Sequence, residues 1–262
     1  MEIGKRLEAM RRAGPLVHNI TNYVAMQRMA DILLAAGAAP AMIHAREEAA
    51  EFARIASALT VNIGTLSPEW TAAMAEAAGA ARGAGRPWVL DPVAAGATAY
   101  RREVSARLVA LKPDAVKGNA SEILALAGAG GAGRGVEAGD DVAAAEDAAR
   151  ALARLTGGIV AVTGPVDFVT DGARAFRIAN GDAVMTRVTA IGCALTGVVA
   201  AFLAGEGDRL EAAAAALAYY GVAGERAAAA AAGPGDFAQR FPDALFALDG
   251  AALDRLAKVE PA

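Results

Sequence analysis

The stretch VTAIGCALTG, residues 188–197, runs directly into an apolar segment, a pattern that predicts a turn followed by a helix over residues 192–204. The first N–H groups of a helix have no partner inside it and face outward with the positive end of the helix dipole, so this corner is a candidate anion site. The corner carries Gly192 and Cys193, the only cysteine of the chain. Close packing of small residues is the alternative explanation, so the corner alone does not define a function.

The composition favours one folded α/β domain that spans residues 1–262. The chain is 55% hydrophobic and only 5% aromatic, which suits alanine-rich helices packed closely on a sheet. Its formal net charge of −4, without a stripe of Lys or Arg, lacks the electrostatic footprint of a nucleic-acid binder. We therefore expect no nucleic-acid partner.

Cysteine content and apolar runs bear on where the protein works. A single cysteine excludes an internal disulfide framework, and the first residues lack the apolar core of a signal peptide. Apolar runs such as residues 212–220 are too short, and too closely bounded by charge, to span a bilayer. We therefore expect a cytoplasmic protein without a membrane partner.

Short β-rich runs alternate with longer alanine-rich runs, which predicts a mainly parallel central sheet flanked by helices. We expect strands at residues 41–43, 59–62, 88–90, 115–117, 159–163 and 167–170. We expect helices over residues 47–59, 69–83, 121–127, 140–155 and 192–204, and tightly packed helical stretches at 212–216 and 227–232. Ser67 and Pro68 supply a helix cap and a first helical residue, and the glycine-rich segment 128–135 predicts a surface loop.

Charged side chains follow several of the expected strands, and in an open parallel sheet the ligand crevice lies at the carboxyl ends of the strands. Asp91 ends one strand, where a carboxylate needs a cation, a donor or solvent, although it could also serve a turn. Glu122 lies three residues after Asn119, so it either closes a capping box or joins Asp91 in holding magnesium through waters. Lys117, at the end of the expected strand that precedes Asn119 and Glu122, is then close enough to neutralise phosphate oxygens.

Six blocks of sequence together resemble the hydroxyethylthiazole kinase family. They are LVHNITNYV at residues 16–24, MIHAREE at 42–48, NIGTL at 62–66, DPVAAGAT at 91–98, KGNASEI at 117–123 and GCALT at 192–196. Their order and spacing cover nearly the whole chain, and several are specific to this family within the wider ribokinase-like group.

The resemblance implies a ribokinase-like three-layer α/β fold and phosphoryl transfer from ATP to the hydroxyl of 4-methyl-5-(2-hydroxyethyl)thiazole, a thiamine salvage step. It also implies a homotrimer with its active sites at the subunit interfaces. Carried over by position, it implies substrate contacts from Asn22, Met42, Gly64 and Ala190, ATP contacts from Lys117 and Thr163, Mg²⁺ held by Asp91 and Glu122, and a catalytic corner at Gly192 and Cys193.

Two positions depart from the pattern of that family. The family commonly has arginine where Lys117 stands, and lysine offers a point charge in place of a planar fork, which reduces the geometric definition of a phosphate contact. It usually has glycine where Ala190 stands, and a methyl group there is expected to narrow the approach of the hydroxyethyl arm. These departures are the support for an alternative function, that of a protein that binds its ligands without turnover.

The mechanism that we expect rests on alignment and charge stabilisation, because phosphoryl transfer asks little covalent chemistry of a protein. Backbone N–H groups around Gly192 hold the transferring group, and Cys193 positions the substrate hydroxyl, because an ordinary thiol is mostly protonated at neutral pH. A competing interpretation makes Cys193 the nucleophile of an acyl-transfer enzyme with His18 or His44 as its base. No third orienting residue is evident for that arrangement.

Overall fold

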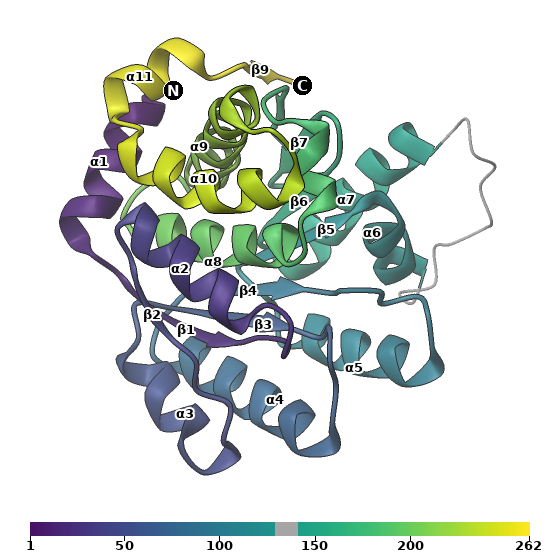
Figure 1. Ribbon diagram of the computed structural model, residues 1–262. Coiled ribbons are helices and arrows are strands. Elements are labelled where there is room, and N and C mark those ends of the chain that lie inside the picture. The colour runs from purple at the N-terminus through teal and green to yellow at the C-terminus, as the bar shows by residue number, and fades with distance from the viewer. Residues whose placement is uncertain (129–140) are drawn as a thin grey trace.

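The computed structural model describes residues 1–128 and 141–262, and in this part of the chain one nine-stranded sheet forms the centre (Figure 1). The strand order is β2-β1-β3-β4-β5-β6-β7-β8-β9. All pairs from β2 to β6 are parallel, and those from β6 to β9 are antiparallel. The strands are β1 (Leu16–Ile20), β2 (Ala39–Ala41), β3 (Ala58–Asn62), β4 (Trp88–Asp91), β5 (Ala115–Asn119), β6 (Ile159–Thr163), β7 (Asp167–Thr170), β8 (Ala175–Ile178) and β9 (Val259–Pro261).

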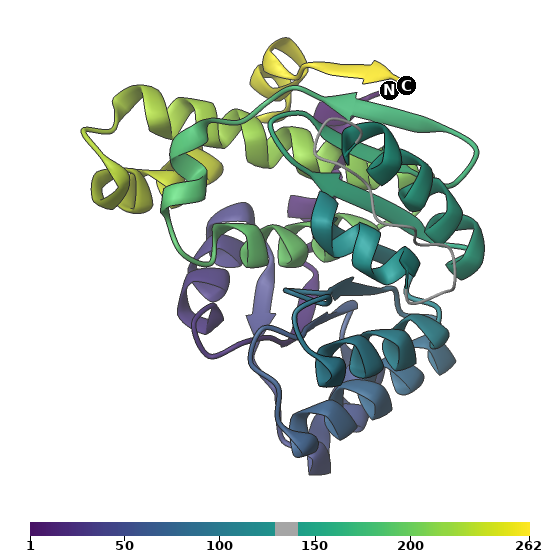
Figure 2. The same cartoon turned by 90° about the vertical axis from the view of Figure 1, so that its right-hand side faces the viewer.

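Two helical layers cover the two faces of the sheet, as Figures 1 and 2 show. One layer contains α3 (Arg46–Ile55), α4 (Pro68–Gly83), α5 (Ala99–Ala110), α6 (Ala120–Ala127) and α7 (Asp141–Thr156). The other contains α1 (Ile3–Ala13), α2 (Met26–Ala36), α8 (Ile191–Leu203), α9 (Arg209–Ala230), α10 (Pro234–Ala247) and α11 (Gly250–Leu256). A 3-10 helix, η2 (Ala183–Arg187), precedes α8. The predicted three-layer α/β fold is confirmed.

The central strands are apolar on both sides because each side is covered by helices. In β4, Val89 packs into the core beneath α8 and α9, whereas Trp88 and Leu90 pack into the core beneath α4 and α5. Burial of both faces leaves the carboxyl ends of β1, β3, β4, β5 and β6 as the edge where polar side chains gather. That edge is where α8 begins.

Local signals set several helix boundaries as predicted. The side chain of Ser67 accepts a hydrogen bond from the Trp70 N–H, and Pro68 is the first residue of α4. Two predicted elements differ most from the structure, and the strand predicted at 115–117 extends to Asn119. The strand expected at 41–43 is β2, Ala39–Ala41, and the helix expected over 47–59 ends at Ile55. That helix ends early because β3 begins at Ala58 and is paired on both sides, with β1 and β4.

Several elements were not among those expected, namely α1, β1, α2, α5, β8, α10, α11 and β9. The stretches expected at 212–216 and 227–232 belong almost wholly to one long helix, α9, which ends at Ala230. From residue 129 onward the predicted loop 128–135 lies outside the described residues, as does residue 140 of the predicted helix 140–155. No described helix combines the length and the apolar character needed to cross a membrane.

Candidate active site

The N-terminus of α8 is uncapped. Ala190 precedes the helix in the left-handed conformation, with φ of 68°, and makes no side-chain cap. The first N–H groups of α8 therefore have no helical carbonyl in front of them. In the part of the chain that the structure describes, a Cβ atom placed on Gly192 would meet no atom within 4 Å outside its chain neighbours and its own helix backbone, so the space beside this turn is open. The turn and helix predicted at this corner are present in the structure, and the anion site remains a prediction.

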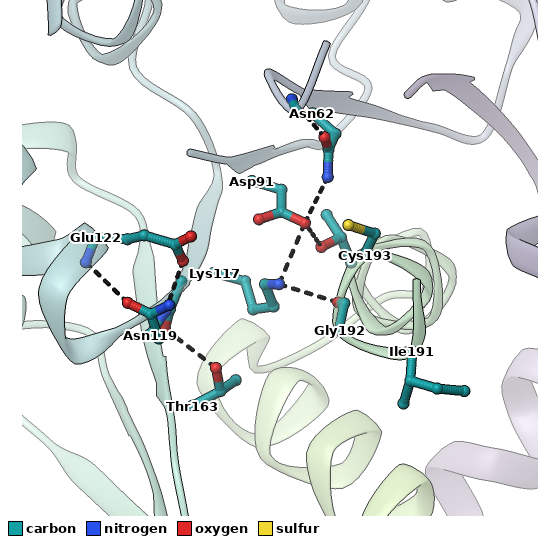
Figure 3. A network of polar contacts seen from close by, with 12 residues as sticks. Asn62, Asp91, Lys117, Asn119, Glu122, Thr163, Ile191, Gly192 and Cys193 are labelled. Carbon is teal, nitrogen blue, oxygen red and sulfur yellow. Dashed lines mark hydrogen bonds and ion pairs between the residues drawn. The ribbon is translucent and has the colours of Figure 1, made fainter. Parts of the chain in front are cut away.

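Asp91 is the centre of a buried polar network below this corner (Figure 3). Its Oδ2 atom accepts hydrogen bonds from Asn62 Nδ2 at 2.8 Å, Thr196 Oγ1 at 2.8 Å and Lys117 Nζ at 3.2 Å. Lys117 also donates to the carbonyl oxygen of Gly192 at 3.0 Å. The network thereby joins the ends of β3, β4 and β5 to the first turns of α8.

The pKa values of Asp91 and Lys117 are shifted because both side chains are buried and lie close together. Burial raises the pKa of Asp91 above its ordinary value, and the ammonium of Lys117 opposes that shift. Burial would lower the pKa of Lys117, but Asp91, Cys193 and Glu122 outweigh it, so the pKa of Lys117 is raised. Three donors converge on one oxygen of Asp91, and among the described residues its other oxygen, Oδ1, has no hydrogen-bond partner that could accept a proton. The contacts therefore favour an ionised pair at neutral pH.

Glu122 closes the capping box that the sequence left open as an alternative. Its Oε2 accepts from the Asn119 N–H at 2.8 Å, while the Asn119 side chain accepts from the Glu122 N–H at 2.9 Å. Its Oε1 accepts from the Ala94 N–H at 3.0 Å. Both carboxylate oxygens are thus used once, and each keeps a further lone pair.

The acidic pair fits magnesium only as an ion that keeps most of its waters. Asp91 Oδ1 is a buried oxygen without a partner, it points toward Glu122 in Figure 3, and the negative charge of Glu122 contributes to the raised pKa of Asp91. The described residues contain no cluster of three or more His, Cys, Asp or Glu side chains placed to hold a metal. Magnesium commonly binds through one or two carboxylates, waters and substrate phosphates, which matches this donor set.

A second group of predicted residues gathers beside Cys193. Asn22 Nδ2 donates to Asn62 Oδ1 at 2.9 Å and to the Cys193 sulfur at 3.4 Å. Gly64 lies against Asn22, because a Cβ atom on Gly64 would come within 2.8 Å of that amide. Met42 lies beyond the end of β2 and is partly buried against the core. The structure therefore brings Asn22, Gly64 and Cys193 together and leaves Met42 at the outer strand.

A cavity of about 530 Å³ is lined by Ile191, Gly192 and Leu195 of α8. Cys193 and Thr196 of the same helix are not among its lining residues and contact Asn22 and Asp91 instead. Thr163, Gly192 and Asp167 line the cavity, together with Leu195 and Tyr220 on its apolar wall. Thr163 donates to the Gly118 carbonyl at 3.3 Å, and the Tyr220 hydroxyl donates to the Ile191 carbonyl at 2.7 Å.

Asp167 is a charged residue of this cavity that the sequence analysis missed. Burial raises the pKa of Asp167 to about 7, although the Gly164 N–H and the Lys117 charge oppose that shift. Asn62 and Thr196 were also missed. The strand-end rule would have found Asn62 at the end of β3, whereas nothing local marks Thr196 inside an apolar helix.

The histidines do not support an acyl-transfer site. His18 Nε2 is hydrogen-bonded to the Ile43 carbonyl at 2.8 Å, and His44 Nε2 to the Thr21 backbone. Burial lowers the pKa of His18 to about 4. Burial and the charge of Asp91 raise the pKa of the Cys193 thiol. A protonated thiol without a histidine among its recorded contacts is a poor nucleophile.

Comparison with solved structures agrees with this architecture. A ribokinase-like superfamily protein from Enterococcus faecalis V583 matches with a TM-score of 0.64, covering 92% of this chain and 93% of that chain. At 12% identity this likeness shows the fold alone. The chain therefore shares the fold of a ribokinase-like protein, and in this fold the open N-terminus of α8 borders both a cavity and a buried polar network.

Comparison with sequences is more specific. A model described as "Hydroxyethylthiazole kinase family" matches residues 7–250. Hydroxyethylthiazole kinases from Cereibacter sphaeroides and Rhizobium etli are 61% and 62% identical to the chain, covering 99% and 97% of it and 98% of each relative. The structure of the hydroxyethylthiazole kinase protein from Pyrococcus horikoshii OT3 has a TM-score of 0.92 at 40% identity, covering 99% of this chain and 98% of that chain. The chain belongs to the hydroxyethylthiazole kinase family, which confirms the resemblance.

Proposed function

We propose that this chain transfers the terminal phosphoryl group of ATP to the hydroxyl of 4-methyl-5-(2-hydroxyethyl)thiazole, giving ADP and the thiazole phosphate, as a step of thiamine salvage. Membership of the family supports this reaction. The main structural observation in its favour is the position of the α8 N-terminus. The uncapped N-terminus of α8 lies between the cavity lined by Thr163 and the polar group of Asn22, Gly64 and Cys193.

In this proposal the nucleotide occupies the cavity with Thr163 and Lys117 near its phosphates, and the alcohol lies beside Asn22 and Gly64. The first N–H groups of α8, around Gly192, hold the transferring phosphoryl group as its charge spreads over three oxygens. Lys117 adds a fixed positive charge, and its ammonium keeps one N–H beyond the two contacts recorded for it.

Cys193 is proposed to position the substrate hydroxyl. Its raised pKa keeps the thiol protonated at neutral pH, so it does not remove the proton of the alcohol. We assign Met42 and Ala190 to the alcohol site as well, Met42 on the family resemblance alone because it lies at the outer strand β2. Ala190 is a non-glycine residue in the left-handed region, a conformation with a steric cost to folding.

Asp91 and Glu122 are proposed to hold Mg²⁺ through waters, with the phosphates of ATP completing its shell. When bound, magnesium supplies charge neutralisation between the phosphates. The contribution of this chain is to orient the two carboxylates: Asn62, Thr196 and Lys117 fix Asp91, and the capping box fixes Glu122.

We further propose a single domain over residues 1–262, a cytoplasmic location, and a homotrimer in which a neighbouring subunit completes each alcohol site. Tyr23 and Val24 support the trimer, because they follow Asn22 and are 66% and 63% exposed. The Tyr23 ring lies 4.5 Å from that of Trp70, which extends the apolar surface at this point. Light scattering of the purified chain measures the subunit number.

One assay tests the reaction and separates a catalyst from a protein that only binds. The chain is mixed with ATP, magnesium and the thiazole alcohol, and ADP release is followed with and without the alcohol. Alcohol-dependent ADP release with one thiazole phosphate formed per ADP supports the proposal. Saturable binding of ATP and the alcohol without ADP release would identify a protein that only binds. ADP release at the same rate with and without the alcohol would contradict the proposed substrate.

A further inference from the structure

Arg101 joins the two loops that follow β3 and β4. Its Nη1 donates to the carbonyl oxygens of Ile63 at 2.6 Å and Val93 at 2.8 Å, and its Nη2 donates to that of Gly64 at 2.7 Å. The backbone of Arg101 is itself fixed, because its N–H donates to Thr98 Oγ1 at the start of α5. One guanidinium thus connects three carbonyls of two separate loops.

Both loops lead from the strand ends into the candidate active site. Gly64 is held from its other side by Asn62, whose Oδ1 accepts the Gly64 N–H at 2.8 Å. Gly64 also lies so close to Asn22 that a Cβ atom has no room between them. A displacement of the Gly64 carbonyl is therefore transmitted directly to the amide that contacts Cys193.

Asp91 is held mainly by groups outside the loops that Arg101 bonds, because only Asn62 among its three side-chain donors also contacts Gly64. Asn62, Thr196 and Lys117 all donate to its Oδ2 atom, and none of these bonds passes through the guanidinium. The cavity is also separate, because Arg101 is not among its lining residues. Loss of Arg101 is thus expected to disturb one half of the site and to spare the other.

We propose that Arg101 is a positioning residue that sets the Gly64 loop against Asn22 and so determines the affinity for the alcohol substrate. This inference rests on the proposed function, which assigns Gly64 and Asn22 to the alcohol. The fork geometry is essential to the role. Two guanidinium nitrogens reach three carbonyls at different positions, whereas a lysine offers a single nitrogen centre.

The test compares Arg101→Lys with Arg102→Lys. Arg102 is the neighbouring residue on α5, is exposed, and donates to one carbonyl, that of Gly96, at 2.9 Å. For Arg101→Lys we expect the KM for the thiazole alcohol to rise about tenfold while the KM for ATP stays within about twofold, because a small misplacement at a substrate contact is costly. For Arg102→Lys we expect both constants to remain near those of the original chain.

A second variant separates positioning from stability. In Arg101→Ala, methylguanidinium at millimolar concentrations is expected to lower the raised alcohol KM, and methylammonium at the same concentration is not. Unchanged alcohol KM in Arg101→Lys with a lowered Tm, or an equal rise of both KM values, would overturn the positioning role.

The test of Arg101 can be distinguished from the test of the proposed reaction. If the original chain shows no ATP-dependent turnover, the reaction fails, and the increase in Tm caused by the alcohol alone then reports on Arg101. Loss of that increase in Arg101→Lys, with its retention in Arg102→Lys, supports the inference. Equal increases in both variants, or none in the original chain, contradict it.

Discussion

Two helices begin at the same edge of the sheet, and their N-termini are built in opposite ways. At α6, Asn119 and Glu122 satisfy each other's backbone N–H groups in a capping box. At α8, Ala190 offers no side chain to the helix, and the space beyond Gly192 is open. The first N–H groups of α8 are thus available to the phosphate that we propose there, whereas the capping box at α6 already uses the N–H groups of Asn119 and Glu122.

The largest expected effect comes from removing the negative charge of Asp91, which pairs with Lys117 and bonds Thr196 in α8. Asp91→Asn leaves the ammonium of Lys117 buried without its ionic partner, an arrangement that costs about 3–5 kcal/mol of folding stability. We expect turnover to fall about a hundredfold, because the proposed magnesium site also loses a charge. Urea unfolding and steady-state kinetics at several magnesium concentrations measure the two effects. Asp243→Asn, at an exposed position of α10, is the control, and equal behaviour of both variants would remove Asp91 from the site.

Filling the open space tests the comparison most directly. Gly192→Ala adds a methyl group where nothing lies within 4 Å, so we expect the fold to keep its Tm. The methyl group would project into the proposed phosphate position, and we expect kcat/KM for ATP to fall about tenfold or more. Gly79→Ala is the matched control, because Gly79 also lies in a helix and its added Cβ also meets nothing within 4 Å. Full activity of Gly192→Ala would show that the phosphate binds elsewhere.

A pH effect sharpens the comparison on the cavity side of α8. Because the pKa of Asp167 is raised to about 7, its carboxyl stays protonated in the folded state up to that pH, whereas in the unfolded state it ionises near 3.8. Between about pH 4 and 7 the folded state holds the extra proton, so the contribution of this group to stability falls as the pH rises. Above pH 7 the ionised carboxylate would repel the triphosphate that we propose for this cavity. We expect the ATP KM to rise about threefold from pH 6 to 8, and to stay flat in Asp167→Asn.

The Asp167→Asn comparison has a second readout. The Tm of the variant minus that of the original chain is expected to grow from pH 4 to pH 7 and then to level off. The asparagine oxygen can still accept the Gly164 N–H, so the turn itself is retained. A constant difference across this range would contradict the raised pKa.

The smallest effect is expected at Ala190. Glycine adopts φ of 68° without the steric cost that the Cβ atom of alanine carries there. Ala190→Gly should therefore stabilise the fold by about 1 kcal/mol and raise the Tm by about 2 °C. The alcohol KM should fall, because a methyl group is removed beside the proposed hydroxyethyl position. Calorimetry and kinetics test the two parts, and a lowered Tm would show that the alanine is not strained.

The predictable parts of the fold were those with local causes. The capping box follows from the spacing of Asn119 and Glu122, and the start of α4 follows from Ser67 and Pro68. The end of α3 was mispredicted because an alanine-rich run continues the helical pattern to Leu59, while pairing on both sides pulls residues from Ala58 onward into β3. Tertiary pairing overrode local propensity at that point.

The candidate site was predictable only where a motif or a strand end marked it. Asp91 and Lys117 were found in this way, but their mutual contact at 3.2 Å depends on the register of neighbouring strands. Thr196 bonds Asp91, which is 105 residues away in the chain, and Arg101 bonds carbonyls that are 8, 37 and 38 residues away. The sequence around Thr196 and Arg101 does not indicate these partners. Such roles emerge from the packed structure.

The first turns of α8 are anchored at three points: Tyr220 holds the Ile191 carbonyl, Lys117 holds the Gly192 carbonyl, and Thr196 is bonded to Asp91. The entropy of ordering this turn is therefore spent when the chain folds, before any nucleotide arrives. Association with a phosphate should then show little loss of backbone freedom, and its calorimetric signature should be governed by desolvation and charge.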